Sequence, residues 1–482
     1  MPFAARRFSI GSQPGAEMMQ IDRRSLLGGI AAGAALAGAP AQAGSKPGGP
    51  PFLPSDIGTL KRVLVHSVTP QDRGGDRLDP GLLPYAESDM AVMAEQQAGL
   101  IRLLKANGAE VVEVKDALAA AIAATRKSGI FAAWLEASFP LIAADPDRVT
   151  ADTILGRDPA FANRLGADGN WRHYADDSAS TMWTRDSAIM TPQGLVMGRS
   201  VSLRRRRENH LLRFCYQHSP LLTRYPVVFD AMEEGIGLEG GDMTVVDRNT
   251  IFLGNGNRTD PRISPLLAQR LNMDVVAVQT VKREYIRPAR MGSAAQMLEL
   301  QLLLLHLDTY FTLVAPKHAL TVPWLMEKDH AETNPLSRYI RGARAQNLLE
   351  EEEAEKGLTM LKEFGKVTLY RAGTGKKEDL GDLKLVDWLK GQGWHFTWVG
   401  GARPAGDEAA YAAFMATAYA ELRRQASNIV QARPGRVIAY AGNPATKAAL
   451  EADGIAVDTF PARELWAWHG GPHCLTQPLE RL

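Results

Sequence analysis

Cysteine is nearly absent from this chain of 482 residues, which contains only Cys215 and Cys474. At most one bridge can form, so a scaffold held together by several disulfides is excluded. The chain also has no excess of charge of either sign, because its 55 Lys and Arg residues nearly balance its 54 Asp and Glu residues. Aromatic residues make up an ordinary 7% of the sequence. This composition indicates neither a nucleic-acid partner nor a strongly acidic one. The length suits two or three domains, or one large repetitive domain.

Long hydrophobic runs are missing as well. The apolar stretch from Leu26 to Gly38 is Gly-rich and too short to span a bilayer of about 30 Å. It follows paired arginines, Arg23-Arg24, and precedes small residues at 41–43, as in a cleavable signal of the twin-arginine type. The sequence therefore predicts a signal peptide over 1–43, a Pro/Gly linker over 44–54, and a periplasmic protein without a stable membrane anchor. An uncleaved anchor is the alternative.

Metal-binding spacings are a further absence. No His-x-x-x-His, Cys-x-x-Cys or Asp-x-Asp-x-Asp-Gly pattern occurs in the sequence. His306 and Asp308 would share one face if they alternate along a strand. His469 and His473 flank Cys474 and offer an alternative metal set with it. We expect no metal and no cofactor, because a catalytic interpretation explains more of these residues.

Short apolar strands and amphipathic helices alternate through the rest of the chain. The expected strands cover 62–66, 111–114, 187–190, 194–197, 243–246, 250–253, 309–314, 428–430, 436–440 and 455–457, and the expected helices 89–106, 208–218, 264–271 and 444–452. Such repetition of one unit indicates a closed, pseudo-symmetric α/β arrangement with loops that converge on a centre. We assign 55–482 to this catalytic domain, with an Ala-rich helical insertion over about 116–172.

The two cysteines differ in their surroundings. Cys215 lies in an amphipathic segment, Leu211–Tyr216, and is expected to pack in the core. Cys474 follows Gly470-Gly471-Pro472-His473, where close backbone approach and a polar, partly exposed environment would let a thiol ionise. A buried, inert thiol is the alternative for Cys474.

Three acidic segments upstream supply what a guanidine-attacking thiolate needs. They are Trp183-Thr184-Arg185-Asp186, Leu238-Glu239-Gly240-Gly241-Asp242 and His306-Leu307-Asp308-Thr309, each next to an expected strand. A guanidinium is planar and cationic, so carboxylates match its hydrogen-bond fork. Its carbon is a poor electrophile, and a thiolate together with a proton donor makes its substitution feasible. Each residue alone is also explained as a turn cap or a solvated side chain.

These motifs, in this order and ending in Gly-Gly-Pro-His-Cys-Leu-Thr, resemble the arginine deiminase family within the guanidino-group-modifying superfamily. The resemblance covers nearly the whole chain after the signal and implies a five-bladed α/β propeller. It also implies that Asp186 and Asp308 clamp the guanidinium while Cys474 attacks its carbon. His306, oriented by Glu239, would be the general acid and then the general base, and arginine would give citrulline.

The resemblance also assigns residues to the other end of the substrate. The run Leu203–Glu208 matches a segment in which an arginine grips the α-carboxylate; Arg205 fits best by its spacing and Arg206 is the alternative. A solvated run of arginines is the interpretation without the family. Arg258 matches a second carboxylate-binding arginine.

Three more positions complete the expected substrate site: Asp242, Ser180 and His469. Ser180 replaces an asparagine, and His469 replaces a gating arginine five residues before the nucleophile. These two departures leave the guanidine chemistry untouched but bear on selectivity for L-arginine.

The expected function is hydrolysis of the guanidino group of L-arginine, or of a related small guanidino compound. An amidinotransferase that passes the amidine to an amine is the first alternative, and a non-catalytic guanidino-binding protein is the second. The sequence leaves open whether the chain forms a homo-oligomer.

Overall fold

The computed structural model describes residues 52–72, 88–158, 175–202, 205–282, 285, 303–327 and 334–482. These residues belong to one unit, Pro47–Leu482. The predicted signal peptide, most of the predicted linker, the end of the predicted helical insertion, and Leu203 and Arg204 lie outside them.

Short strands joined in threes recur along the chain. The strands are β1 (Leu60–Val65), β2 (Glu110–Glu113), β3 (Ala188–Met190), β4 (Leu195–Met197), β5 (Val227–Asp230), β6 (Met243–Val245), β7 (Thr250–Asn255), β8 (Asp274–Gln279), β9 (Phe311–Ala315), β10 (His318–Thr321), β11 (Lys366–Tyr370), β12 (Lys377–Lys384), β13 (His395–Trp398), β14 (Val430–Arg433), β15 (Arg436–Tyr440), β16 (Ala456–Phe460) and β17 (Gln477–Arg481). The three-stranded sets are β17-β1-β2, β3-β4-β5, β6-β7-β8, β9-β10-β13 and β14-β15-β16. In every set the middle strand is antiparallel to the first and parallel to the third. The repeat expected from the sequence is therefore present, and the fold is mixed α/β.

A helix makes the crossover between the parallel strands of four sets, because parallel strands need a long connection. These helices are α1 (Met90–Ala106), α5 (Arg206–His218), α7 (Ile263–Leu271) and α13 (Pro444–Ala452). In the remaining set the crossover contains α9 (Pro335–Ala345), α10 (Glu351–Glu363), β11, β12 and α11 (Leu385–Lys390). The strands β11 and β12 extend the β6-β7-β8 sheet to five strands, an extension that the sequence did not predict.

Local sequence signals explain where α1 begins and ends. The Asp89 carboxylate caps the helix by accepting from the backbone N–H groups of Ala91 and Val92. The helix stops before Gly108, whose φ of +87° is a left-handed conformation that favours glycine. The predicted helix 89–106 is thus confirmed, together with its stop.

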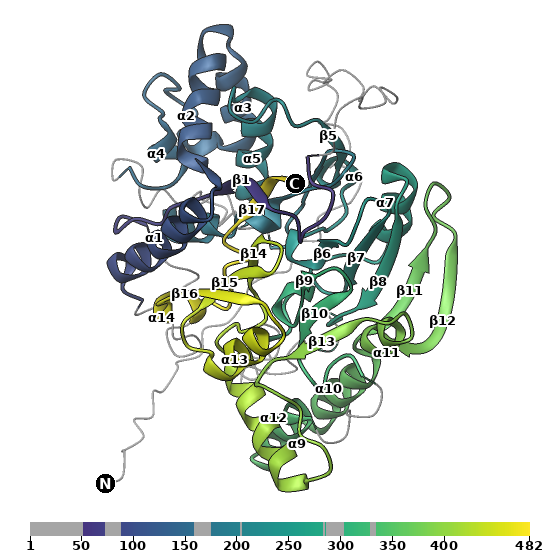
Figure 1. The fold of residues 1–482 in the computed structure, drawn as a ribbon. Coiled ribbons are helices and arrows are strands. Elements are labelled where there is room, and N and C mark those ends of the chain that lie inside the picture. Colours follow the sequence, from purple (N-terminus) through teal and green to yellow (C-terminus); the bar gives the residue numbers. More distant parts are fainter. Residues whose placement is uncertain are drawn as a thin grey trace, which may run out of the picture. The chain divides into compact units, whose positions relative to one another are not determined.

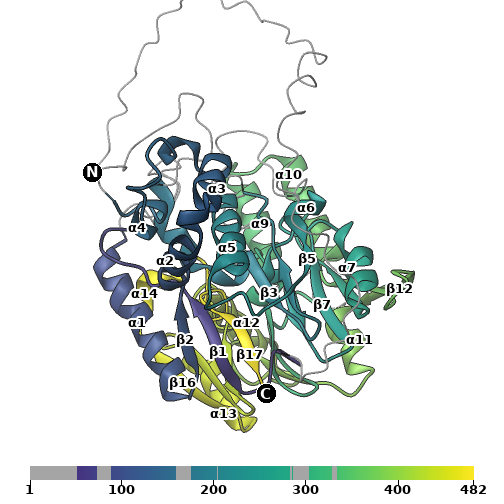
Figure 2. The same ribbon diagram turned by 90° about the horizontal axis from the view of Figure 1, so that it is seen from above.

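The predicted helical insertion contains α2 (Val114–Thr125), α3 (Ile130–Ser138) and α4 (Ala151–Ile154) within its described part. The helix α2 packs against α5, and Figures 1 and 2 both show α2 and α3 beside α5. Trp134 of α3 stacks on Phe214 of α5, with 4.1 Å between ring centroids. Cys215, also on α5, is fully buried in the same apolar cluster, as expected for a packing residue. Burial alone raises the pKa of its thiol.

The last strand of the chain joins the first. β17 pairs antiparallel with β1 (Leu60 opposite Arg481), and Figure 1 shows the two strands side by side. The buried Arg481 donates from Nη1 to the carbonyl oxygens of Gly58, at 2.6 Å, and Gln431, at 2.8 Å. The first set of strands is therefore built from both ends of the described chain.

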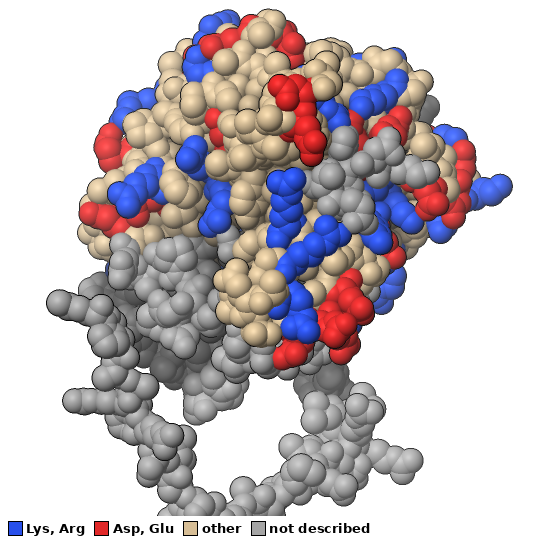
Figure 3. All heavy atoms as spheres, turned by 90° about the horizontal axis from the view of Figure 1, so that it is seen from below, with Lys and Arg blue, Asp and Glu red and all other residues tan. Residues whose placement is uncertain are grey.

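Basic and acidic side chains are interspersed on the face shown in Figure 3, in line with the balanced composition. Among the helices that the structure describes, none has the length and apolar character needed to cross a membrane.

Candidate active site

The predicted chemical residues lie at equivalent places, just before the first strand of a set. Asp186 belongs to the 3₁₀ turn η5 (Thr184–Ser187) before β3, and Asp242 to η6 (Gly240–Asp242) before β6. Asp308 lies in η9 (Leu307–Thr309) before β9, and Cys474 precedes β17. The turn η6 packs against both η5 and η9. Repetition of one backbone unit therefore brings together side chains that are far apart in the sequence.

The expectation that His306 and Asp308 alternate along a strand is wrong. His306 has extended backbone angles and caps η9, whereas Asp308 lies inside that turn. The strand begins only at Phe311. The turn allows the Asp308 side chain to reach the region of Cys474 while His306 faces Glu239.

Glu239 and His306 form a buried pair. Nε2 of His306 lies 2.9 Å from Oε2 of Glu239, and both side chains are fully buried. The other Glu239 oxygen accepts from Ser200 Oγ at 2.7 Å and from the Val201 N–H at 3.0 Å. These bonds fix the carboxylate, and the carboxylate in turn fixes the imidazole ring.

The charges around His306 favour its imidazolium form. Burial works against that form, yet Asp186, Glu239 and Asp242 outweigh it and raise the pKa of His306 to about 9. Burial also opposes ionisation of Glu239, but Arg258, His306 and Arg205 hold the pKa of this carboxyl well below its ordinary value. With Nε2 engaged by Glu239, Nδ1 is the ring nitrogen on the other side, 3.7 Å from Oδ1 of Asp186. It has no hydrogen-bond partner among the described residues.

The backbone at Gly241 closes around this ring. A Cβ at position 241 would lie 2.6 Å from Nδ1 of His306, which is closer than packed atoms approach. The Gly241 N–H donates to Oδ1 of Asp186 at 3.2 Å. Glycine is therefore required between Asp186 and His306 in the motif Glu239-Gly-Gly-Asp242.

Asp242 supports the site through hydrogen bonds from both of its oxygens. Its Oδ1 accepts from the Leu307 N–H at 3.0 Å, and its Oδ2 accepts from Thr259 Oγ1 at 2.7 Å. Burial is the main reason that the pKa of this carboxyl rises to about 7. The contacts tie η6 to η9 and so fix the place of His306.

Cys474 is buried rather than partly exposed, which corrects the expectation from its Gly-Gly turn. Its Sγ lies 3.5 Å from Oδ2 of Asp308 and 3.2 Å from Nδ2 of Asn428. Burial, followed by the charges of Asp308 and Asp186, raises the pKa of the thiol well above its ordinary value. The thiol is therefore protonated at neutral pH.

Asn428 is a site residue that sequence reasoning missed. Its Oδ1 accepts from the backbone N–H groups of Gly471, at 3.0 Å, and Cys474, at 3.1 Å. Its Nδ2 lies 3.2 Å from both the Asp308 carbonyl oxygen and the Cys474 sulfur. The signal was its position before β14, where the other sets place their chemical residues.

A second missed feature is a chain of charged and polar groups behind the thiol. Nδ1 of His473 lies 2.8 Å from Oδ2 of Asp308, and Nε2 of His473 lies 2.8 Å from Nη2 of Arg185. Nη1 of Arg185 lies 3.6 Å from Asp56. Burial and then Arg185 lower the pKa of His473, so the neutral ring donates from Nδ1 to Asp308 and accepts from Arg185 at Nε2. His473 thus positions Asp308 and does not join Cys474 in a metal set.

The residues expected at the substrate's far end are partly engaged with one another. Arg205 donates to Oδ2 of Asp186 from Nη1 at 2.8 Å and to Oε2 of Glu208 from Nη2 at 2.9 Å. Ser180 donates to the other Glu208 oxygen at 2.6 Å. Nη1 of Arg258 lies 3.6 Å from Glu239. Arg205, Arg258 and Ser180 therefore surround the carboxylates, and a guanidinium already lies against Asp186 in this state.

Arg206 and His469 are the two further residues expected near the substrate, and their surroundings differ. Arg206 donates from Nε to the Ser200 carbonyl oxygen at 3.1 Å, so it is turned toward backbone rather than toward Asp186. His469 follows α14 (Arg463–Trp466) with a left-handed φ of +58°. Burial, and then the charge of Arg423, lower the pKa of His469 to about 4, so its ring is neutral.

One ligand atom from each of Asp186, Glu239 and His306 lies within 4.8 Å of the other two, and the three could bind a cation. Two guanidinium groups stand against them, however, because Arg205 is bonded to Asp186 and Arg258 approaches Glu239. These fixed positive charges disfavour a dication. The cluster is better suited to proton transfer and to holding a planar organic cation.

The part of the chain that contains most of the site residues is similar to a known protein family. A family model described as "Arginine deiminase" matches residues 157–363 and 411–481, more than half of the chain. The chain belongs to the arginine deiminase family. The match includes every residue placed in the site above except Asp56.

Two individual relatives align with this chain over most of their length. The arginine deiminase of Listeria monocytogenes serotype 4a (strain HCC23) is 24% identical over 457 residues, covering 89% of this chain and 97% of the relative. The arginine deiminase of Metamycoplasma arthritidis (strain 158L3-1) is also 24% identical, covering 89% and 96%.

Solved structures were also matched. The product-bound N-terminal domain of ArgZ, an arginine dihydrolase of cyanobacteria, is 12% identical with a TM-score of 0.46, covering 88% of this chain and 98% of that domain. A citrulline complex of DDAH from Pseudomonas aeruginosa is 12% identical with a TM-score of 0.43, covering 87% of this chain and 99% of that one.

Proposed function

We propose that this protein hydrolyses the guanidino group of L-arginine to citrulline and ammonia through a covalent adduct on Cys474. The observation that supports this most directly is the meeting of a buried thiol with Asp308 at 3.5 Å, beside an imidazole held by Glu239 at 2.9 Å. Membership of the arginine deiminase family supports the same reaction. The carboxylates Asp186 and Asp308 would hold the planar guanidinium between them.

The substrate's own charge would activate the nucleophile. The same two carboxylates contribute to the raised pKa of Cys474. A guanidinium placed between them offsets their charge and favours the thiolate. The thiol proton has Oδ2 of Asp308 as its nearest carboxylate acceptor. Sulfur then bonds to the guanidinium carbon and gives a tetrahedral adduct.

His306 would transfer protons in both halves of the reaction. Its pKa of about 9 makes it an imidazolium at neutral pH. The proton on Nε2 is bonded to Glu239, so the proton on Nδ1 is the one available for transfer. This proton passes to the departing amino group, so the C–N bond breaks and ammonia leaves. The neutral ring then takes a proton from water, whose oxygen attacks the amidino carbon. The C–S bond breaks as the new hydroxyl group loses its proton to solvent, Asp308 returns a proton to the sulfur, and citrulline leaves.

Arg205 and Arg258 would hold the carboxylate of arginine. Arg205 is bonded to Asp186, so a guanidinium that binds to this carboxylate would displace it. The released Arg205 is then available for the substrate carboxylate, and it stays tethered through Glu208. Asp242, Ser180 and His469 complete the proposed substrate surroundings, and Asp242 acts by fixing η6 against η9.

The test is to incubate the purified protein with L-arginine and quantify citrulline and ammonia. Replacement Cys474→Ala should abolish turnover, whereas Cys215→Ala, which alters the other thiol, should retain it. Full activity of the Cys474→Ala protein would refute the covalent mechanism. Ornithine plus a new guanidine, formed without ammonia when glycine is added, would instead identify an amidinotransferase.

We also propose that the five sets of strands form the five blades of a propeller, with the site at its centre. Their shared strand order and the equivalent places of Asp186, Asp242, Asp308, Asn428 and Cys474 support this arrangement.

Export is a separate proposal that rests on the sequence of residues 1–43 alone. Fusion of these residues to a reporter that folds before export should place it in the periplasm, and Arg23→Lys with Arg24→Lys should retain it in the cytoplasm.

A further inference from the structure

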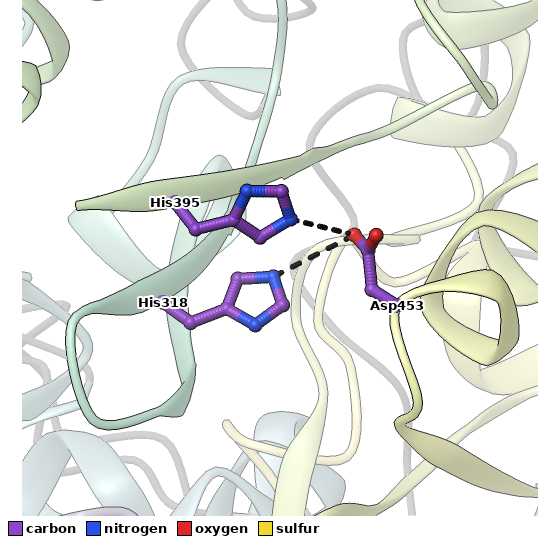
Figure 4. A group of neighbouring side chains, drawn as sticks. All are labelled: His318, His395 and Asp453. Carbon is purple, nitrogen blue, oxygen red and sulfur yellow. Dashed lines mark ion pairs between the residues drawn. The ribbon is translucent and has the colours of Figure 1, made fainter. Parts of the chain in front are cut away.

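Two histidines face each other on neighbouring parallel strands, away from the residues of the proposed reaction. His318 begins β10 and His395 begins β13, and the two are direct partners in the strand register. Their rings lie 4.4 Å apart between centroids. Figure 4 shows both rings pointing toward the same carboxylate. Imidazole is a suitable ligand for transition-metal ions such as zinc, and backbone pairing holds these two rings close together.

The carboxylate belongs to Asp453, which caps the C-terminal end of α13. Its Oδ2 lies 3.2 Å from Nε2 of His395 and 3.7 Å from Nε2 of His318. One ligand atom from each of the three residues lies within 4.8 Å of the others. The three side chains therefore converge on a single point, two from the β9-β10-β13 sheet and one from the end of α13, as Figure 4 illustrates.

We propose that His318, His395 and Asp453 form a binding site for a divalent transition-metal cation such as Zn²⁺. Zinc bound tetrahedrally at about 2.0–2.1 Å places its ligand atoms about 3.3 Å apart. The two separations from Asp453, 3.2 Å and 3.7 Å, bracket that value. Imidazole nitrogen and carboxylate oxygen are both ordinary zinc ligands.

The exposed fraction differs among the three side chains and indicates a site that is open to solvent on one side. The side chain of His395 is 61% exposed and that of Asp453 is 29% exposed, whereas His318 is 10% exposed. An ion can therefore enter from the solvent side and keep water at a fourth position. The buried histidine and its strand partner give the site its fixed geometry.

Thr397, two residues after His395 on β13, supports this geometry. Its Oγ1 hydrogen-bonds to Asp453 Oδ2 and lies 2.8 Å from Nε2 of His318. Because the hydroxyl has one proton and donates it to the carboxylate, Nε2–H of His318 is the donor to Thr397 in the metal-free protein. Metal binding moves the His318 proton to Nδ1 and frees the Nε2 lone pair, while Thr397 continues to orient Asp453.

The site would connect two sets of strands. His318 and His395 belong to β9-β10-β13, whereas Asp453 leads from α13 into β16 of the β14-β15-β16 set. Asp308 precedes β9, and His318 follows the turn at that strand's other end. We therefore infer a structural role, in which the cation stabilises the contact between the two sets and takes no part in the reaction.

The experiment is a zinc titration of the full chain without a polyhistidine tag, after chelator treatment. A Cys474→Ser background removes the active-site thiol as a competing ligand. Isothermal titration should give one saturable Zn²⁺ per chain and a higher midpoint of thermal unfolding with Zn²⁺ than with chelator. His395→Ala and Asp453→Asn should each weaken affinity at least tenfold and abolish the shift, and His218→Ala, at the end of α5, should change neither.

Folding of the variants is a simple check, because His395 is mostly exposed. Without Zn²⁺, His395→Ala should keep the unfolding midpoint of its parent. The proposal is overturned if Zn²⁺ fails to saturate a site in the parent protein. Equal Zn²⁺ affinity in the parent, His395→Ala and Asp453→Asn proteins would also overturn it.

Discussion

The protonation of two neighbouring groups decides how this site works. Burial, followed by the charges of Asp308 and Asp186, raises the pKa of the Cys474 thiol. Burial lowers the pKa of His306, but the charges of Asp186, Glu239 and Asp242 outweigh it and raise this pKa to about 9. The site therefore holds a neutral thiol and a charged imidazole. A guanidinium between Asp186 and Asp308 would offset the charges that disfavour the thiolate, while Glu239 and Asp242 still favour the imidazolium of His306.

Glu239 should set the alkaline limit of activity. In the proposed reaction His306 must be protonated to release ammonia, so kcat/KM should fall as pH rises through about 9. Glu239→Gln removes one of the charges that raise this pKa, so the alkaline limb should move to lower pH. A pH profile of citrulline formation measures this, with the exposed Glu408→Gln as control. An unchanged limb in Glu239→Gln would contradict the role of the pair.

The same shift has a consequence for stability. The folded-state pKa of His306, about 9, lies above its ordinary value of 6.5. The folded protein therefore holds more protons between these pH values, and the contribution of His306 is complete below pH 6.5. It should be lost as pH rises through about 9.

Asn428 offers a test of how the thiol is positioned. Asn428→Asp keeps an oxygen for the N–H groups of Gly471 and Cys474 but replaces the donor to sulfur with a negative charge. Loss of such a bond costs about 1.5–3 kcal/mol, so kcat/KM should fall about 10- to 100-fold or more. The pH dependence of thiol alkylation should shift to higher pH. Asn249→Asp, in an exposed turn, is the control, and wild-type alkylation in Asn428→Asp would refute this role.

Among the secondary-structure elements, the 3₁₀ turns before the first strands matter most for chemistry. The turn η6 makes room for His306 only because residue 241 is glycine, since a Cβ there would lie 2.6 Å from Nδ1. Gly241→Ala should displace the ring and lower kcat about 100-fold, because small misplacements of catalytic groups are costly. Gly342→Ala, in α9 with open space around it, is the matched control. Normal kcat in Gly241→Ala would show that the close approach is unimportant.

The elements also show what the sequence could and could not predict. Strands such as β15 and helices such as α13 were predicted because apolar periodicity and Pro444 mark them directly. The turn η9 was mistaken for strand, because Leu307-Asp308-Thr309 has no pattern that separates a 3₁₀ turn from the β run after it. The strand β12 was missed because its residues are mostly charged and exposed.

The site residues were likewise predicted only where the sequence marks them locally. The ionisable residues stood out because each lies beside an apolar strand, whereas the amide of Asn428 gave no chemical signal. The pairing of Arg185 with His473 joins residues 288 positions apart, so only the fold brings them together. Burial of Cys474 was likewise invisible, since the glycines before it are explained by close packing against Trp183 and Asn428 rather than by exposure.

The molecule as a whole depends on its last strand, because β17 completes the sheet that β1 begins. Leu479 lies in the middle of β17 and is fully buried. Leu479→Ala should reduce the free energy of unfolding by about 2–5 kcal/mol through the cavity it leaves. Leu482, three residues later and 72% exposed, gives the matched control, for which about 0.5 kcal/mol or less is expected.

This variant also tests whether the joined ends serve the site. Cys474 lies three residues before β17, so loosening of the strand should release the thiol from Asn428 and Asp308 before β3 or β6 separate. On heating, Leu479→Ala should lose citrulline formation and gain thiol reactivity at lower temperature than wild type, in step with unfolding monitored by circular dichroism. If activity instead survives to the wild-type temperature, the pairing of β17 with β1 is not what holds the nucleophile in place.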